Sequence, residues 1–263
     1  MGEVNLHTVR LGNTGNPILM LHGWGQTLES LQPLGELLAT SAQVHLIDLP
    51  GFGASALPDE DWDTNQYAER ILRYMDENNL EKVDLLGHSF GGRVSIRLAS
   101  KYPDRVRSVV LINSGGLQRR PSFQQQIRSQ LIKWLRVVFG WIPIFGSSLK
   151  EWHTQRFGSR DYLNAGKLRG TLVKTVTEDL TSNAESILAP TLLIWGELDT
   201  ETPIEMAHRY HQLIPNSKLI SLPGRDHFLF RNEGSHLCAY YVLQWLRDVS
   251  EPNPINSRQL SHV

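Results

Sequence analysis

Short runs of consecutive apolar residues recur along the chain, and a glycine or a polar turn closes each of them. Apolar positions that are continuous rather than alternating predict strands that are covered on both faces of a sheet. We therefore predict strands at the start of the following segments: 17–25, 44–55, 83–92, 106–116, 190–199 and 217–227.

Helical patterns lie between these runs, in the segments 28–39, 63–79, 92–102, 203–214 and 235–249. Strands that alternate with helices predict an α/β fold with a doubly wound, mostly parallel sheet. Right-handed crossovers then bring the carboxyl ends of the strands, and the loops that follow them, to one edge of the sheet. We therefore expect the residues of a functional site to lie in those loops.

One long stretch breaks the alternation, because no strand is predicted in it and its middle is helical and rich in aromatic residues and arginine. It falls between two predicted core strands, so we interpret it as an insertion over the strand ends. The polar end of the chain contains prolines and is expected to be disordered. The predicted segments are a first core part, 1–116, a helical cap, 117–184, a second core part, 185–250, and a disordered tail, 251–263.

The composition fits one large α/β domain with an insertion, since 263 residues with 40% hydrophobic and 20% charged residues are typical of a soluble globular protein. No apolar run approaches the length of a membrane span, and no secretory pattern opens the chain. The single cysteine, Cys238, cannot form an internal disulfide. We expect it to be a buried apolar residue in a cytoplasmic protein.

The net charge of −1 favours no global attraction to nucleic acid, but the charge is unevenly spread. The predicted cap holds 11 lysine and arginine residues against 4 acidic ones, a net charge of +7. A solvated basic face explains this charge. The alternative is that the cap attracts an anionic substrate or an acidic carrier, such as an acyl group on acyl carrier protein, through Arg119, Arg120 and Arg128.

The stretch VDLLGHSFGGRV passes from a predicted strand to a predicted helix through the turn Gly87-x-Ser89-x-Gly91. Glycines often end strands simply because they tolerate positive φ. A Gly-x-Ser-x-Gly turn can also hold a strained serine, exposed above a parallel sheet, at the start of a helix. The neighbouring motifs decide between these readings.

Three further motifs follow predicted strands: HGWG at 22–25, GELD ending in Asp199, and GRDHF containing His227. A serine nucleophile needs an adjacent base, for which His227 is the candidate. The imidazole needs a carboxylate to orient it, for which Asp199 is the candidate. The oxyanion needs two donors, and the main-chain N–H groups of Trp24 and Phe90 are in position to supply them.

In combination, the motifs HGWG, DLPGFGAS, GHSFGG, GELDTETP and GRDHF resemble those of the α/β-hydrolase family, over nearly the whole chain apart from the tail. The order Ser, Asp, His along the chain is also that of the family. The resemblance implies that Ser89 is the nucleophile, Asp199 the acid and His227 the base. The N-terminal half is similar to the pimeloyl-acyl-carrier-protein methyl ester esterase branch of the family.

Other titratable residues near these motifs are assigned structural roles. We expect His22 and Asp48 to organise loops and His88 to pack or shape the pocket. Asp226 directly precedes the candidate base, and neighbouring side chains diverge, so it is a poor orienting group. Glu197 is the alternative acid; the segment LINSGG after the preceding core strand offers no carboxylate.

These residues predict a serine hydrolase that cleaves carboxylic esters of small to medium apolar acyl or aryl groups, with no cofactor and no metal. Trp134, Phe139 and Trp141 of the cap are candidate substrate contacts, unless they only pack the cap against the core. Three other functions remain open. They are carbon–carbon bond hydrolysis of ring-cleavage products, slow-turnover ligand binding by a signalling protein, and lipase action at a membrane surface.

Overall fold

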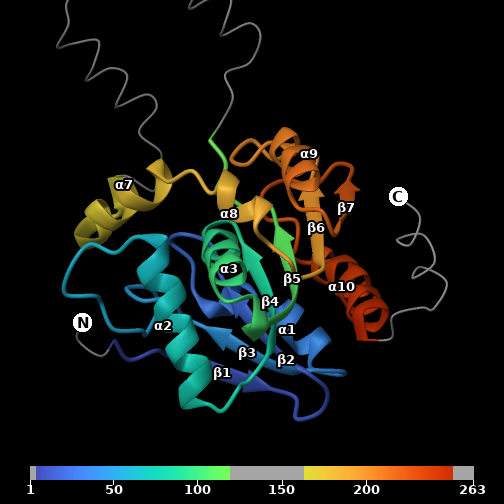
Figure 1. The fold of residues 1–263 in the computed structure, drawn as a ribbon, viewed down its shortest axis with the longest axis horizontal. Helices are drawn as coiled ribbons and strands as arrows, with labels where there is room; N and C mark the ends of the chain where they lie inside the picture. Colours follow the sequence, from blue (N-terminus) through green and yellow to red (C-terminus); the bar gives the residue numbers. More distant parts are fainter. Residues whose placement is uncertain (1–3, 119–162, 251–263) are drawn as a thin grey trace, which may run out of the picture.

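The computed structural model describes residues 4–118 and 163–250, which form a seven-stranded sheet in the order β1-β3-β2-β4-β5-β6-β7 (Figure 1). β1 runs antiparallel to β3, and all the other neighbouring strands are parallel. The predicted α/β fold with a doubly wound, mostly parallel sheet is confirmed. The strands are β1 (Thr8–Leu11), β2 (Pro17–Leu21), β3 (Gln43–Ile47), β4 (Val83–His88), β5 (Val106–Ile112), β6 (Thr191–Gly196) and β7 (Ser217–Leu222).

The sequence pattern does not predict β1. This four-residue edge strand pairs with β3 from Thr8 opposite Ile47 to Leu11 opposite Val44. None of its residues is fully buried. A partly exposed edge strand has no continuous apolar run, so the pattern that identifies the inner strands does not identify it.

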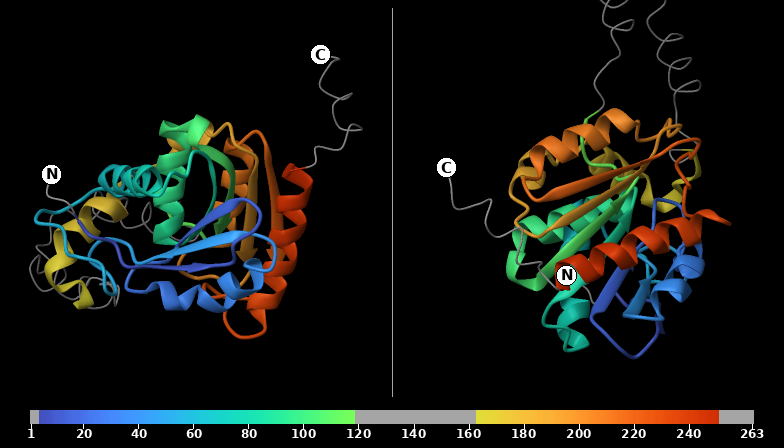
Figure 2. Two further views of the ribbon diagram at one scale, coloured as in Figure 1. Left: turned by 90° about the horizontal axis from the view of Figure 1, so that it is seen from below. Right: turned by 90° about the vertical axis from the view of Figure 1, so that its right-hand side faces the viewer.

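Helices cover both faces of the sheet (Figure 2). One buried cluster joins the sheet to α2, α3, α8 and α9, and a second joins it to α1 and α10. In the described ranges, no helix is both long and apolar enough to cross a membrane. The helices are α1 (Gln32–Leu38), α2 (Thr64–Glu77), α3 (Phe90–Lys101), α7 (Arg169–Thr177), α8 (Thr181–Glu185), α9 (Ile204–Leu213) and α10 (Gly234–Ser250), with 3-10 turns η1 (Leu28–Ser30), η2 (Pro103–Arg105) and η3 (Gly166–Leu168).

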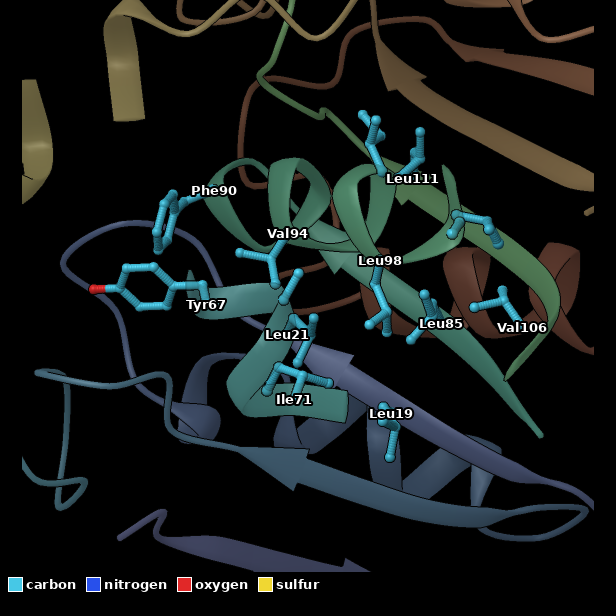
Figure 3. Close-up of a cluster of buried hydrophobic side chains, with 14 of the residues drawn as sticks. Leu19, Leu21, Tyr67, Ile71, Leu85, Phe90, Val94, Leu98, Val106 and Leu111 are labelled. Atoms are coloured by element: carbon cyan, nitrogen blue, oxygen red, sulfur yellow. The ribbon is translucent and has the colours of Figure 1, made fainter. Parts of the chain in front are cut away.

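The largest cluster of buried side chains holds α3 against the middle of the sheet (Figure 3). Leu21 of β2 and Leu85 of β4 are completely buried there, with Val94 and Leu98 of α3. Burying a large aliphatic side chain contributes about 1.5–3 kcal/mol, so this packing fixes the position of α3 firmly. The first turn of α3 is thereby held at the carboxyl ends of β2 and β4.

Between β5 and β6, the described residues from 163 onward form η3, α7 and α8. Residues 119–162 of the predicted cap, and the predicted tail, lie outside the described residues. Leu180 and Ala184 are completely buried in the same cluster as α3 and α9. The last turns of the segment predicted as a cap therefore pack as part of the core.

Glu178 fastens the chain between α7 and α8 to the core. Its Oε1 accepts a hydrogen bond of 3.0 Å from the N–H of Thr64, and its Oε2 accepts from the Thr64 hydroxyl. Arg97 of α3 donates from Nη2 to the same Oε2 at 3.1 Å and from Nη1 to Asn183 Oδ1 at 3.0 Å. These charge-assisted contacts hold α7 and α8 over the first turns of α2 and α3.

The turn from β4 into α3 leaves no room for side chains at two positions. A Cβ on Gly91 would lie 2.0 Å from the carbonyl oxygen of Leu21, and one on Gly87 would lie 2.5 Å from the carbonyl oxygen of Gly91. The N–H of Gly91 also donates to the carbonyl of His22 at 3.0 Å. Glycine is required here by close approach of main chain to main chain.

We predict that Gly91→Ala lowers the free energy of unfolding by about 3 kcal/mol or more, because the main-chain atom in the way cannot rotate aside. Gly224→Ala is the matched control, since Gly224 has φ +71° but open space around its Cβ position. That variant should lose only about 1–2 kcal/mol, from backbone strain. Urea unfolding followed by circular dichroism measures both, and equal losses would contradict the steric explanation.

Candidate active site

Ser89 sits at the turn between β4 and α3 with φ 48° and ψ −105°, a conformation that residues other than glycine rarely adopt. Its N–H donates to the carbonyl of Ile112 at 3.2 Å, and its own carbonyl accepts from Gly115 at 3.1 Å. The end of β5 therefore holds the strained main chain in place. Ser89 lines a cavity of about 710 Å³ at the carboxyl ends of the strands.

His227, which follows β7, is buried, and its Nδ1 lies 2.8 Å from Oδ2 of Asp199, which follows β6. Asp199 Oδ1 also accepts from the N–H groups of Glu201 at 2.7 Å and Thr202 at 2.8 Å. The Thr202 hydroxyl donates to Oδ2 at 2.6 Å. An ionised Asp199 accepts the proton of Nδ1, so Nε2 is the ring nitrogen left to accept a proton.

Burial by itself would raise the pKa of Asp199. The hydrogen bonds from His227 and Thr202, together with the attraction of the His227 ring, outweigh burial and hold the pKa of Asp199 below its usual value. The carboxylate therefore stays charged while it orients the imidazole.

The other ring nitrogen of His227 faces a residue that the sequence analysis did not single out. Nε2 lies 3.3 Å from Oε2 of Glu201, whose side chain is 55% exposed. Among the hydrogen bonds within the described ranges, none joins the hydroxyl of Ser89 to this ring. The rings of His227 and His88 are nevertheless 4.8 Å apart between centroids, so the imidazole lies beside the serine turn. The only sequence signal for Glu201 is its place two residues after the candidate acid.

The main chain of His227 is held by two side chains from the middle of the sheet. His88 donates from Nε2 to the His227 carbonyl at 3.0 Å, and Asn113 donates from Nδ2 to the same oxygen at 2.9 Å. Asn113 also accepts from the N–H of Gly196 at 2.9 Å through Oδ1. It stands in the segment LINSGG, which contains no carboxylate, and no sequence motif indicates that its amide braces the His227 main chain.

The two candidate oxyanion donors lie in the loop after β2 and at the first residue of α3, next to Ser89. The rings of Trp24 and Phe90 pack edge to face with centroids 5.2 Å apart, and both residues line the cavity. The bond from Gly91 to the carbonyl of His22 ties the first turn of α3 to the Trp24 loop. The N–H of Phe90 also lies at the amino end of α3, where unpaired N–H groups favour negative charge.

His22 and Asp48 organise loops, as expected. His22 donates from Nδ1 to the carbonyl of Gly23 at 2.8 Å and accepts from the N–H of Leu49 at 3.0 Å through Nε2. Both ring nitrogens are thus occupied, and burial lowers the pKa of His22 to about 4. Asp48 accepts from the N–H groups of Leu28 at 2.7 Å and Ala54 at 3.0 Å.

The two alternative carboxylates do not reach the imidazole. Glu197 accepts from the hydroxyl of Ser221 at 2.6 Å, in an exposed position. Asp226 accepts from the N–H of Phe228 at 2.9 Å within its own turn. The candidate substrate contacts Trp134, Phe139 and Trp141 lie outside the described residues. In the part of the chain that the structure describes, no cluster of three or more His, Cys, Asp or Glu side chains is placed to hold a metal ion.

Comparison with known proteins places this geometry in context. The sequence model of the alpha/beta hydrolase fold matches residues 16–233. A pimeloyl-[acyl-carrier protein] methyl ester esterase from Nitrosomonas europaea is 31% identical over 86% of this chain and 94% of its own length. An abhydrolase domain-containing protein from Caenorhabditis elegans is 30% identical over 73% of this chain, which spans 48% of that relative. A thermophilic esterase from Thermogutta terrifontis has the same fold, with a TM-score of 0.70, 22% identity and 94% of each chain covered.

We predict that the protein loses stability as the pH falls from 6.5 towards 4. Burial lowers the pKa of His22 to about 4 and that of His88 well below its usual value. The folded protein then binds fewer protons than the unfolded chain in this range, so stability is complete above pH 6.5 and declines below it. The shift at His22 corresponds to about 3 kcal/mol.

Urea unfolding between pH 4 and 8 measures this dependence. His22→Gln should be less stable at pH 7 but should lose less stability on acidification than the wild type. Exposed His236 supplies the control, and His236→Gln should follow the wild-type curve. A His22→Gln variant with the full wild-type pH dependence would show that the buried ring is not responsible.

Proposed function

The chain belongs to the α/β-hydrolase fold family, and we propose that within it this protein is a serine hydrolase that cleaves carboxylic esters through an acyl-enzyme. One observation carries the proposal. The Asp199–His227 hydrogen bond of 2.8 Å lies beside a serine held at positive φ between β4 and α3. A buried carboxylate on Nδ1 and a hydroxyl at the mouth of a cavity are what acyl transfer by a Ser-His-Asp triad requires.

In the proposed reaction, Ser89 Oγ attacks the ester carbonyl carbon while His227 Nε2 takes the hydroxyl proton. The ionised Asp199 stabilises the resulting imidazolium. The N–H groups of Phe90 and Trp24 donate to the oxyanion of the tetrahedral intermediate. The imidazolium returns the proton to the leaving alkoxide, and the alcohol departs. Water then attacks the acyl-enzyme with His227 as base, which releases the acid and restores Ser89.

Glu201 fits this cycle through the charge that it presents to the imidazole. Its carboxylate lies 3.3 Å from Nε2 of His227, so its negative charge faces the nitrogen that takes the proton of Ser89 in the proposed reaction. The side chain is more than half exposed, so it can turn aside when an ester brings Ser89 and the ring together. Catalytic hydrogen bonds often shorten only when substrate is bound.

The cavity supports an ester of small to medium size. Its volume of about 710 Å³ lies within the usual range for small-molecule sites. Leu172 and Val176 of α7 and Met206 of α9 supply apolar walls. We propose that the cap, 117–184, completes the roof with residues such as Trp134, Phe139 and Trp141.

We predict that the wild type turns over nitrophenyl esters many times and that Ser89→Ala lowers kcat by about 10⁴-fold or more. A chain-length series of esters, followed by nitrophenolate release, measures both and reports the size of the acyl pocket. Activity retained by Ser89→Ala would overturn the assignment of the nucleophile. A wild type that ignores esters but cleaves a vinylogous diketone would identify a carbon–carbon bond hydrolase, and a single slow turnover would identify a ligand-binding protein.

The assignment of the acid has its own test. Asp199→Asn should lower kcat by roughly 10⁴-fold, because the amide holds the wrong imidazole tautomer and cannot stabilise the cation. Glu197→Gln is the matched control at the end of the same strand and should leave kcat within about twofold of the wild type. Equal losses in the two variants would count against Asp199.

We also propose that the substrate is presented by an acidic carrier. The name of the Nitrosomonas europaea relative and the +7 charge of the cap support this idea. Reversing the charges of Arg119, Arg120 and Arg128 should lower kcat/KM on an acyl-carrier-protein-linked ester about tenfold or more and leave nitrophenyl esters unaffected. Control reversals at exposed positions away from the cap are Lys82→Glu, Lys218→Glu and Arg247→Glu. Rates on the carrier-linked ester that do not change with salt would contradict the proposal.

A further inference from the structure

Arg93 brings a positive charge into the wall of the cavity that Ser89 lines. It lies four residues after Ser89 in the first turns of α3, so the two residues share one side of the helix, about 6 Å apart along its axis. The guanidinium is half-buried, beneath the chain that leaves α7. Neither the sequence motifs nor the proposed ester chemistry requires an arginine here.

The partners of Arg93 leave most of its hydrogen-bonding capacity unused. Nη1 donates to the carbonyl oxygens of Thr175 at 2.8 Å and Glu178 at 3.4 Å. Within residues 4–118 and 163–250, no acceptor is found for Nε or Nη2, and no carboxylate lies within ion-pair distance. Neither nitrogen therefore has a hydrogen-bond partner in these residues, and Arg93 is among the residues that line the cavity.

Arg97 shows that a merely structural arginine is built differently in this helix. It lies one turn further along α3 and uses all three nitrogens, with Thr64, Asn183 and the Glu178 carboxylate as partners. It is also absent from the walls of the cavity. Both arginines thus bind the chain between α7 and α8, but only Arg93 has unpaired hydrogen-bond donors and lines the cavity.

A half-buried guanidinium with only carbonyl partners is costly, because burial disfavours the charged form and neutral acceptors compensate it poorly. Burial lowers the pKa of Arg93 and the attraction of the Glu178 and Asp179 carboxylates, which lie beyond ion-pair distance, offsets this only in part, although an arginine stays charged at any physiological pH. A ligand carboxylate is the natural partner, since its two oxygens match the fork of the guanidinium. The cavity wall also contains the apolar side chains of Leu117, Leu172 and Met206, which could contact the rest of such a ligand.

The charged side chains of the cavity also favour one orientation of a bound anionic ligand. Glu201 lies against His227, whereas Arg93 lies under the end of α7. A carboxylate is repelled by the first and attracted by the second. The acid portion of an ester stays bonded to Ser89 in the acyl-enzyme, so a contact with Arg93 on the same helix can persist through both halves of the reaction.

We infer that Arg93 is a specificity-determining residue that binds a second carboxylate on the acid portion of the substrate, so that the enzyme prefers monoesters of dicarboxylic acids. This inference rests on the proposed serine hydrolase function and is an alternative to the carrier-linked substrate, because a carrier thioester would take the place of the free second carboxylate. It names the substrate class of that site.

The test compares a nitrophenyl monoester of adipic acid with nitrophenyl hexanoate, which has an acyl chain of the same length without the charge. The wild type should show a kcat/KM for the anionic ester roughly 10- to 100-fold higher than for the neutral one. Arg93→Met should abolish this preference and leave kcat/KM for the neutral ester within about threefold of the wild-type value. Arg93→Lys should restore part of it, because it keeps the charge but not the fork.

Arg97→Met is the matched control for loss of the clamp on the α7–α8 chain. It should keep the preference for the anionic ester even if it lowers stability. If both variants lost kcat/KM equally on the two esters, Arg93 would have only the structural role of holding the α7–α8 chain, and the inference would be overturned. A wild type that hydrolyses both esters without preference would overturn it as well, while leaving the serine hydrolase proposal intact.

A binding measurement makes the inference independent of turnover. Free adipate should raise the Tm of Ser89→Ala, and the double variant with Arg93→Met should lose that shift. Binding without ester turnover would leave the anion site standing and refute the proposed function. Absence of any shift up to tens of millimolar adipate, together with absence of a preference in kinetics, would refute the anion site.

Discussion

The close approach of α3 to the carboxyl ends of β2 and β4 is the constraint on which the rest of the site depends. The main chain of Gly91 touches the Leu21 carbonyl so closely that no side chain fits between them. Three consequences follow from this one contact. Ser89, two residues before Gly91, takes a positive φ; the amino end of α3 lies directly after Ser89; and the Trp24 loop packs against Phe90. The buried aliphatic side chains of β2, β4 and α3 supply the packing energy that maintains the strain (Figure 3).

A second network, formed mainly by side chains that follow β5 and β6, places the imidazole, and His88 of the turn adds one hydrogen bond to the His227 carbonyl. Asn113, which directly follows β5, donates to the carbonyls of Asp226 and His227 and accepts from the N–H of Gly196 at the end of β6. Thr202 bonds to Asp199 with both its N–H and its hydroxyl, and Trp195 anchors Thr202 in turn through a 2.7 Å bond from its indole N–H. The carboxylate therefore reaches the ring already fully hydrogen-bonded. In the proposed reaction, little reorganisation would then be needed when charge develops on the ring, which is the condition for strong electrostatic stabilisation.

The sequence predicted those parts of the molecule that depend on local pattern and on topology. Continuous apolar runs identified the inner strands, and their order brought Ser89, Asp199 and His227 to one edge. The half-exposed strand β1 has no such run, and it was missed. The braces of the site were missed for another reason. An asparagine such as Asn113, or a threonine such as Thr202, acts through hydrogen bonds to main chain that is distant in sequence, and no periodicity or motif records such a bond. Glu201 and Arg93 belong to the same category, since their roles come from what faces them across the cavity.

The two arginines of α3 illustrate how one helix serves both the fold and the cavity. Arg93 and Arg97 are one turn apart, and both reach the segment that returns from α7. Arg93, nearer Ser89, lines the cavity, where the described residues place no carboxylate within ion-pair distance of it. Arg97, one turn further along, is bonded to the carboxylate of Glu178. A permanent carboxylate beside Arg93 would neutralise the guanidinium charge, and the cavity would then no longer attract an anionic ligand. The position of each arginine along α3 thus determines which guanidinium group keeps unpaired donors. The end of α7 lines the cavity, and the residues that follow it bind α3 through both arginines.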